Sequence, residues 1–113
     1  MISKASAMYA RISPRKARMI ADLVRGKNAA EALQVLQYVT KAGAPVVSKV
    51  IESAIANAKI NKPDQDIDLL YVATATVDQG SNKNLRRWRP RAMGRATPIV
   101  KGVSHIVIEL DAR

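Results

Sequence analysis

Residues 80–102 read GSNKNLRRWRPRAMGRATPIVKG, and the rest of the chain is arranged around this stretch. The stretch contains no aspartate or glutamate but seven basic residues: Lys83, Arg86, Arg87, Arg89, Arg91, Arg95 and Lys101. The segments that flank it, 69–77 (LLYVATATV) and 103–110 (VSHIVIEL), alternate and are rich in β-branched residues, which is typical of strands. We therefore predict a long hairpin, because the connection is far longer than an ordinary turn.

The predicted hairpin has little with which to stabilise itself. An isolated two-stranded ribbon is only marginally stable in water, and this one has almost no apolar face to bury. Each arm, if extended, would reach roughly 35 Å. Seven cations without a counter-charge indicate that a polyanion orders the segment.

The composition favours one small domain with a polyanionic partner. The chain has 113 residues, 48% of them hydrophobic, with one Trp and no Phe, so the core must be built from Ala, Val, Ile and Leu. We expect a globular body over 1–79 and 102–113 and an extended hairpin over 80–101. The net charge of +10 indicates nucleic acid or an anionic membrane as the partner. The absence of cysteine excludes disulfides, thiolate metal sites and cysteine nucleophiles.

The sequence shows no sign of export or of membrane insertion. Its first residues, MISKASAMYARISPRK, lack the apolar run of a signal peptide. No stretch approaches the length of about 18 apolar residues that a membrane span requires. The basic stretch also lacks the amphipathic helical pattern of a membrane-surface segment. We therefore expect a cytoplasmic protein with no membrane partner.

Two helical patterns follow the N-terminal segment. Ser13 and Pro14 form a helix start, in which Ser caps the helix and Pro occupies its first turn, and Gly26 suits the C-cap. Asn28 followed by Glu31 resembles a capping box at the start of a second helix. The core-facing positions predicted for these two helices are Ala17, Ile20, Leu23 and Val24, and then Ala29, Ala32, Leu33 and Leu36.

A third helix gives the strongest periodic signal in the chain. It begins around 41–45, and the apolar residues that recur at helical spacing are Val47, Val50, Ile51, Ala54, Ile55 and Ala58. Residues 2–12 form a weaker strand pattern, with Met8, Ala10 and Ile12 on one face. The predicted fold is α+β: three helices packed on one face of a small three-stranded antiparallel sheet, from which the basic hairpin projects.

No constellation of residues predicts catalysis. The single histidine, His105, has no obvious Ser or Cys partner, and its nearest acidic residue along the strand is Glu109. There is no P-loop, GxGxxG or HExxH motif. The sequence therefore predicts neither enzyme activity nor a cofactor or small-molecule substrate. His105 is either a hydrogen-bonded strand histidine or an RNA contact.

Three aspartates, Asp64, Asp66 and Asp68, alternate like the start of a calcium-binding loop. An EF-hand loop also needs glycine at its sixth position and glutamate at its twelfth, and these positions hold Leu69 and Ala75. The segment 61–68 is therefore interpreted as a solvated loop, and no metal site is predicted.

Two basic clusters are candidates for contact with nucleic acid. Residues 86–91 (RRWRPR) combine arginines, which bind phosphate oxygens through two N–H groups, with Trp88, which offers a flat face to a base. Alternatively, Trp88 and Met93 pack on each other, or the segment never orders. The first helix has a charged face that is either simply solvated or in contact with phosphate; its members are Arg15, Arg18, Asp22 and Arg25, with Lys16 at the edge.

An architectural DNA-binding protein that uses basic β-arms is the nearest alternative function. Such proteins usually act as symmetric dimers, and nothing in the sequence indicates a dimer interface. A basic nuclease is a further alternative, but it would need a metal or a histidine–carboxylate pair.

Several motifs of the chain resemble those of one family. They are RISPRKAR at 11–18, DLVRGK at 22–27, ESAIANA at 52–58, PRAMGRA at 90–96 and SHIVIEL at 104–110. Together they resemble the bacterial large-subunit ribosomal protein L-twenty-two over nearly the whole chain. The segment SNKNLRRWR, which precedes Pro90, is a little longer than the family usually shows.

The resemblance implies a structural, RNA-binding protein that supports assembly of the large ribosomal subunit. In the family, the body lies near the outlet of the polypeptide exit tunnel, and the hairpin runs inward through ribosomal RNA to the tunnel wall, near the macrolide site. The expected partners are therefore large-subunit rRNA, neighbouring ribosomal proteins and the nascent polypeptide. The implied tip consists of Arg86, Arg87, Trp88, Arg89, Pro90, Arg91 and Met93.

The residues expected to bind RNA fall into two groups. Those on the body are Arg11, Arg15, Lys16, Arg18, Arg25, Lys27 and His105. Those on the hairpin are Lys83, Arg86, Arg87, Arg89, Arg91, Arg95 and Lys101.

Overall fold

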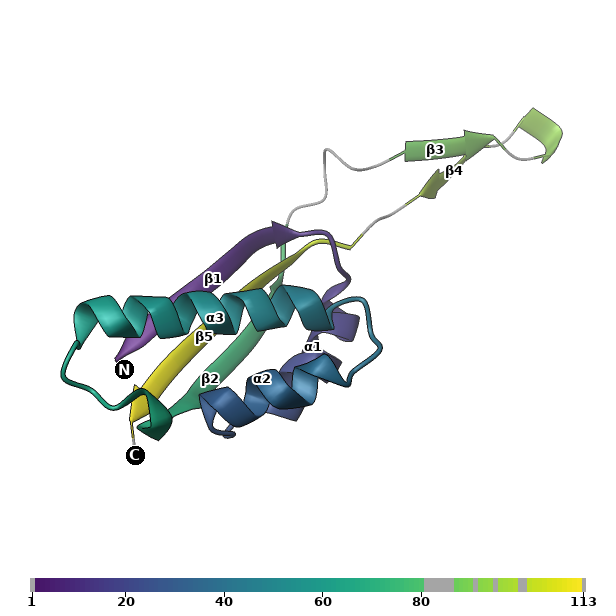
Figure 1. The fold of residues 1–113 in the computed structure, drawn as a ribbon. Helices are drawn as coiled ribbons and strands as arrows, with labels where there is room; N and C mark the ends of the chain where they lie inside the picture. The colour runs from purple at the N-terminus through teal and green to yellow at the C-terminus, as the bar shows by residue number, and fades with distance from the viewer. Residues whose placement is uncertain (1, 81–86, 91, 95, 100–101, 113) are drawn as a thin grey trace.

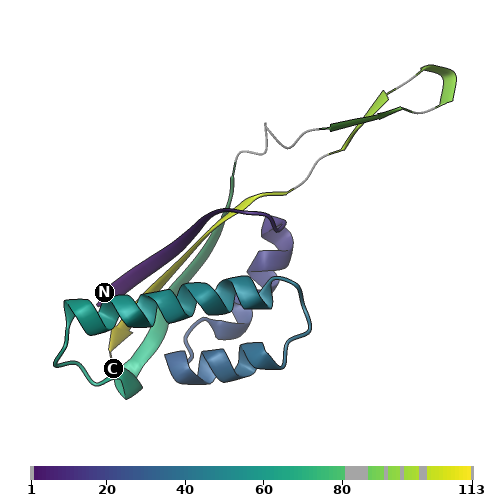
Figure 2. The same ribbon diagram turned by 45° about the horizontal axis from the view of Figure 1, so that its top comes forward.

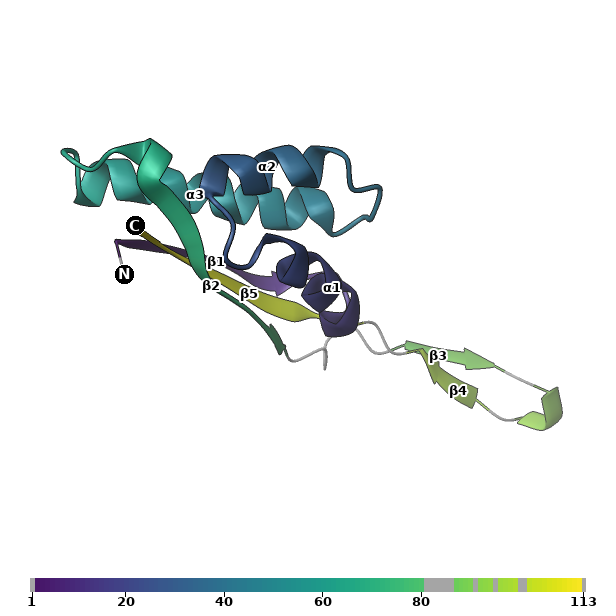
Figure 3. The ribbon, with the colours of Figure 1, turned by 90° about the horizontal axis from the view of Figure 1, so that it is seen from below.

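The computed structural model describes residues 2–80, 87–90, 92–94, 96–99 and 102–112. Over these residues the body forms three helices and a three-stranded antiparallel sheet of order β1–β5–β2. The helices cover one face of the sheet, as Figures 1 and 3 show. The helices are α1 (Pro14–Val24), α2 (Ala29–Gln37) and α3 (Ala44–Asn61), and the strands are β1 (Ser3–Ala10), β2 (Leu70–Gln79) and β5 (Ser104–Ala112). The predicted α+β fold is confirmed.

The central strand β5 pairs with both neighbours and fixes the register of the sheet. Ser3 of β1 lies opposite Leu110, and Leu70 of β2 lies opposite Ala112. The residues of β5 alternate between the helix-covered face and the open face. As predicted, Ile106, Ile108 and Leu110 face the helices, where they are fully buried.

Helix α3 packs along the sheet against β1 and β5 and supplies more of the aliphatic core than any other single element. Of its predicted stripe, Val47, Val50, Ile51, Ala54 and Ala58 are buried, and Ile55 packs partly buried against the core. The small side chain of Ala54 allows close approach, because Ser3 Oγ of β1 donates a hydrogen bond to its carbonyl oxygen at 2.8 Å. The core is therefore built from aliphatic side chains, without any phenylalanine.

The predicted starts of the first two helices are confirmed. Ser13 Oγ accepts the backbone N–H of Lys16, and Pro14 follows it in the first turn of α1. Gly26, with φ of 83°, lies directly after the C-cap of α1 in the left-handed region that glycine tolerates. Asn28 Oδ1 accepts the N–H of Ala30 and starts α2.

Two details of the predicted burial are wrong. Leu23 is 45% exposed, and Ala21 is buried in its place. The reason is that α1 packs against β2, which draws the small side chain of Ala21 inward and leaves Leu23 at the rim. Met8, predicted to share a face with Ala10 and Ile12, is 56% exposed. The pairing of β1 shifts register between Ala7 and Ala10, which ends the alternation there.

The hairpin projects from the body as a two-stranded ribbon (Figures 1 and 2). Strand β3 (Arg87–Pro90) pairs with β4 (Ala96–Ile99), with Arg87 opposite Ile99 and Pro90 opposite Ala96. This register centres the hairpin on Met93, which lies in a tight turn, Ala92–Gly94. The whole molecule measures 66 × 26 × 15 Å along its principal axes.

The tip of the hairpin is therefore displaced from its predicted position. The expected tip was 86–93, but Arg87, Trp88, Arg89 and Pro90 belong to the strand that leads to the turn. Only Met93 of that set lies in the turn itself. Pairing of both arms determines where a hairpin turns, and the predicted tip followed the basic cluster of one arm. Lys83, Arg86, Arg91, Arg95 and Lys101 lie outside the described residues.

Candidate nucleic-acid interface

The hairpin leaves the body at two glycines. Gly80 N–H donates a hydrogen bond to the carbonyl oxygen of Val103 at 2.8 Å. A Cβ atom on Gly102 would lie 2.7 Å from Ser13 Cα, and one on Gly80 would lie 2.9 Å from His105 Cε1. Contacts this short force a shift: at Gly102 the backbone of Ser13 stands in the way, whereas at Gly80 only side chains would have to move. We call this place, where Gly80 and Gly102 meet the first turn of α1 and His105, the hairpin root.

The segment between β1 and α1 is fixed beside the hairpin root. Ser104 Oγ, fully buried, donates a hydrogen bond to the carbonyl oxygen of Ile12 at 2.6 Å, and Ser13 caps α1. These bonds position three exposed cations of this segment and of the first turn of α1, which we call the root cations: Arg11, Arg15 and Lys16.

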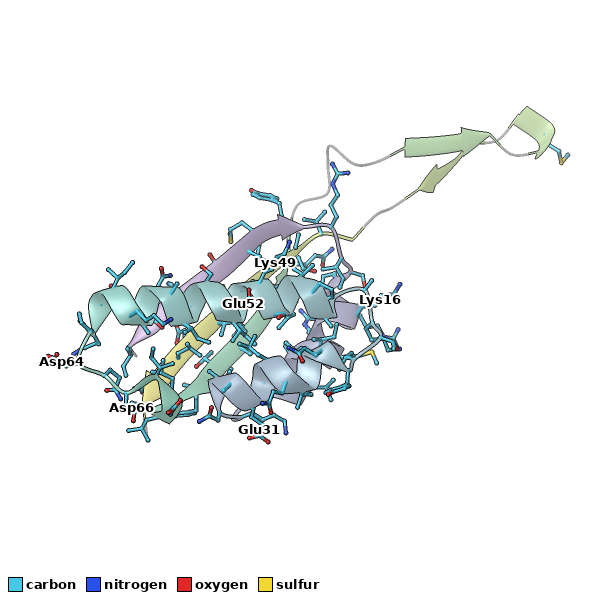
Figure 4. The ribbon with its side chains drawn as sticks, in the orientation of Figure 1. Lys16, Glu31, Lys49, Glu52, Asp64 and Asp66 are labelled. Atoms are coloured by element: carbon cyan, nitrogen blue, oxygen red, sulfur yellow. The ribbon has the colours of Figure 1, made fainter. Side chains whose placement is uncertain are left out.

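Charge is distributed unevenly along the body (Figure 4). Lys16 lies at the end from which the hairpin leaves, whereas Asp64 and Asp66 lie at the opposite end, after α3. Asp68, also exposed, follows in the same connection. Lys59 and Lys62 nearly balance the three carboxylates at the far end, so a polyanion is attracted more strongly to the root end of the body than to the far end.

Two of the predicted RNA-binding arginines also hold the fold together. Arg18 Nε donates to the carbonyl oxygen of Val77 at 3.1 Å, and Arg25 Nη2 donates to that of Ala75 at 2.5 Å. Arg25 additionally pairs with Asp22. Both carbonyls belong to β2, an edge strand of the sheet, so the arginines of α1 cover backbone acceptors that would otherwise face outward.

Further hydrogen bonds occupy positions on both edges of the sheet. At the start of β2, Gly26 N–H donates to the carbonyl oxygen of Val72, whose own N–H donates to that of Lys27. On the other edge, Asn57 Nδ2 of α3 donates to the carbonyl oxygen of Lys4 at 3.0 Å. No sequence pattern indicates these roles, because they depend on which helix lies beside which strand.

His105, in strand β5, is hydrogen-bonded, which agrees with the first of the two roles predicted for it. Its Nδ1 accepts the backbone N–H of Tyr9 at 3.1 Å. The rings of Tyr9 and His105 meet edge to face, with centroids 4.7 Å apart and planes at 89°. Because Nδ1 accepts this bond, the proton of the imidazole lies on Nε2. Sequence reasoning missed Tyr9 as a member of the root.

The remaining predicted RNA-binding residues that the structure describes are Lys27 and two arginines of the hairpin. Lys27 is half-buried, with its Nζ 4.0 Å from Glu31 Oε1. Arg87 and Arg89 alternate with Trp88 along β3. Met93 is 91% exposed at the turn, while the side chain of Trp88 lies outside what the structure describes, so the packing of Trp88 stays a prediction.

Within the described ranges, neither a metal site nor a membrane-spanning helix is found. No group of three or more histidine, cysteine or carboxylate side chains in this part of the chain could hold a metal ion. None of the helices formed by these residues is both long and apolar enough to cross a bilayer. The arrangement presents exposed guanidinium and ammonium groups. These groups can bind phosphate oxygens electrostatically.

Comparison with known proteins identifies the class of protein and then the family. Residues 5–111 match the model of a family of ribosomal proteins, which are structural constituents and not enzymes. The chain belongs to this family, that of ribosomal protein L22p/L17e. It is therefore a structural protein of the large ribosomal subunit, bound to the ribosome in the cytoplasm and associated with rRNA and other ribosomal proteins.

Similar proteins cover the chain almost completely. The large ribosomal subunit protein uL22 of Sorangium cellulosum is 66% identical over 113 residues, which is 100% of this chain and 99% of that protein. The uL22 of Desulfotalea psychrophila is 51% identical over 98% of both chains. That of Lactobacillus gasseri is 51% identical over 98% of this chain and 92% of its own. The family resemblance seen in the sequence motifs is thus confirmed.

Proposed function

We propose that the protein binds large-subunit rRNA through the root cations and the basic hairpin, and that this binding supports assembly of the subunit. The observation that carries the proposal is the position of Arg11, Arg15 and Lys16, exposed beside the root of a hairpin that is itself basic. The acidic end of the body lies on the far side (Figure 4). RNA therefore approaches from the hairpin end.

The hairpin suits a folded RNA better than it suits a protein surface. Folded RNA is recognised largely through its shape, its phosphates and its 2′-hydroxyl groups. A ribbon of two strands is narrow enough to pass between RNA helices, whereas the helix-covered body is not. The cost of ordering the ribbon is offset when its cations meet phosphates.

The cations of the body contribute unequally in this proposal. Arg11, Arg15 and Lys16 direct their charge to solvent and provide the main anchor. Arg18 uses one donor on Val77 and keeps its other N–H groups for phosphate. Arg25 is more fully engaged, because both of its Nη atoms have partners in the fold.

The turn of the hairpin is proposed to line the polypeptide exit tunnel and to meet the nascent chain. Family membership supports this assignment, and Met93 presents the described side chain at the far end of the ribbon. The tip would then lie near the macrolide site. Met93 offers an apolar, adaptable surface that different peptide sequences could pass.

Salt dependence tests the proposed RNA interface. Binding of the full chain to deproteinised large-subunit rRNA is measured as a function of salt, for the wild type and for the triple variant R11A/R15A/K16A. Each lost phosphate contact should lower the log–log slope by about 0.7 to 0.9, so the triple variant should lose about 2 to 3 units. The matched control is K59A/K62A at the acidic end, whose slope should stay near that of the wild type. A salt-independent wild type would overturn the proposal.

The tunnel assignment is tested by cross-linking. Because the chain contains no cysteine, Met93→Cys introduces a single reactive thiol at the turn. In translating ribosomes that carry this variant, a thiol-directed cross-linker should capture the nascent chain. A cysteine in place of Ile60, an exposed residue at the far end of α3, should not. Equal capture from both positions would contradict the assignment.

A further inference from the structure

Tyr9 has a backbone conformation that a bulky residue rarely adopts. Its φ is 57°, in the left-handed region, and it lies where β1 shifts register against β5. Such a conformation costs free energy that the surrounding structure must offset, and strain of this kind is concentrated at functional sites. The result here is a phenol ring that is 63% exposed instead of buried in the sheet.

Two contacts with His105 hold Tyr9 in this conformation. The backbone N–H of Tyr9 donates to Nδ1 of the imidazole at 3.1 Å, and the two rings meet edge to face at 4.7 Å. The first contact fixes the backbone, and the second fixes the ring. Gly80 leaves room for the imidazole here, since a Cβ at this position would lie 2.9 Å from Cε1 of His105.

The exposed ring is therefore oriented before any ligand arrives. A tyrosine has few rotatable bonds, so a ring that is already positioned loses little entropy when it binds. An edge-to-face contact occupies at most one face of the tyrosine ring, so the other stays open. An open, oriented aromatic face is the feature on which proteins stack unpaired bases of RNA.

The surroundings of the ring agree with an RNA ligand. Arg11 is exposed two residues further along the chain, and the hairpin root lies against His105. Asp78 is the cross-strand neighbour of His105 on β2 and is also exposed. Its carboxylate disfavours phosphate at this point, whereas the face of a neutral base carries no charge to repel. The site therefore suits a base, with its phosphates on the side of Arg11.

We propose that Tyr9, positioned by His105, is a stacking platform for an unpaired base of the large-subunit rRNA at the hairpin root. This inference rests on the proposed RNA-binding function and adds a specific contact to it. His105 acts through Tyr9 as a positioning residue. The platform anchors the RNA at the point where the hairpin departs.

The first test compares variants of the full chain in binding to deproteinised large-subunit rRNA. Tyr9→Leu removes the aromatic face and keeps an apolar side chain, and Tyr9→Phe keeps the face. Loss of one stacked base should weaken binding by roughly 5- to 150-fold for Tyr9→Leu. The salt slope should stay unchanged, because no phosphate contact is lost. Tyr9→Phe should bind within about twofold of the wild type.

Tyr38→Leu is the matched control, because Tyr38 is 85% exposed at the end of α2. It should bind as the wild type does. If Tyr9→Leu also binds as the wild type does, or if Tyr9→Phe is weakened as much as Tyr9→Leu, the platform is overturned. If the wild type itself shows no salt-dependent binding, the proposed RNA-binding function fails instead.

A second test needs no variant and so is independent of any effect on folding. The ring protons of Tyr9 are followed by NMR while the wild-type chain is titrated with a short single-stranded oligoribonucleotide. Stacking should shift them upfield, whereas the ring protons of Tyr38 should move little. Equal or absent shifts at the two tyrosines would overturn the platform. His105→Gln should reduce the Tyr9 shift if His105 positions the ring, and an unchanged shift would remove that role.

Discussion

At the scale of single residues, the hairpin is attached to the body at two glycines that lie very close to neighbouring atoms. Gly102 meets backbone atoms of Ser13, which cannot move without disturbing the start of α1. Gly80 meets the ring of His105, which is a side chain and can turn aside. The two glycines are therefore unequal, even though both lie at the hairpin root.

Replacing Gly102 by alanine should destabilise the protein more than replacing Gly80. Overpacking against the backbone of Ser13 should lower the free energy of unfolding by about 1–3 kcal/mol, and Gly80→Ala should cost less. Denaturant unfolding followed by circular dichroism measures both. Gly94→Ala is the control, because Gly94 lies in the hairpin turn with nothing near it, so the unfolding of the body should not change. Equal midpoints for all three variants would contradict this account.

Some residue-scale features could be predicted from sequence and others could not. The capping serine before Pro14 was predictable because the cap bond is local. Tyr9 was not, because its conformation depends on His105, which is far away in the chain. The burial of Ala21 in place of Leu23 likewise depends on how closely α1 approaches β2. The spacing of apolar residues in the sequence does not specify this distance.

At the scale of elements, the sheet is protected at both edges by side chains from helices. Arg18 and Arg25 of α1 bind carbonyl oxygens of β2, and Asn57 of α3 binds one of β1. Open strand edges invite pairing with other chains. The occupied carbonyl groups therefore make both edges less available for pairing with a further strand.

Removing the cover of the β2 edge should promote self-association. In R18A/R25A the carbonyl groups of Val77 and Ala75 lose their side-chain donors, so β2 becomes able to pair with a second copy. Light scattering and sedimentation at increasing protein concentration should show more oligomer than the wild type. R11A/R15A removes the same charge without uncovering an edge and serves as the control. Identical behaviour of the two variants would mean that charge alone keeps the chains apart.

The sequence predicted the elements themselves more reliably than their contacts. The stripe of α3 and the alternation of β5 are long, regular patterns, and both were confirmed. The edge cover was not predictable, because the spacing of Arg18 and Arg25 is the same whether they face solvent, phosphate or a strand. The position of the hairpin turn depends on the register between two arms, and one arm alone does not specify it.

At the scale of the whole molecule, the structure separates a packed body from a ribbon that projects beyond it (Figure 2). The body contains the aliphatic core, while β3 and β4 pair only with each other. Stability is therefore unevenly distributed along the 66 Å axis. We expect RNA binding to stabilise the ribbon of β3 and β4 more than it stabilises the packed body.

Amide hydrogen exchange should reveal this difference directly. In the free protein, amides in β3 and β4 should exchange much faster than those in α3, because a two-stranded ribbon without a core is only marginally stable. Binding to large-subunit rRNA should slow exchange in β3 and β4 and leave α3 nearly unchanged. Equal protection of the ribbon and α3 in the free protein would refute the idea that RNA orders the ribbon.

The two glycines at the hairpin root also bear on how the length of the ribbon can change. They lie where the hairpin joins the body, whereas the number of paired residues sets how far the turn extends. Deleting one residue from each arm, as a facing pair, would bring the turn about 3.4 Å closer to the body and keep the arms paired. Deleting a residue from one arm alone would shift the register and move the side chains of that arm to the opposite face of the ribbon. The length of the ribbon can thus change through paired insertions and deletions, while its attachment to the body stays the same.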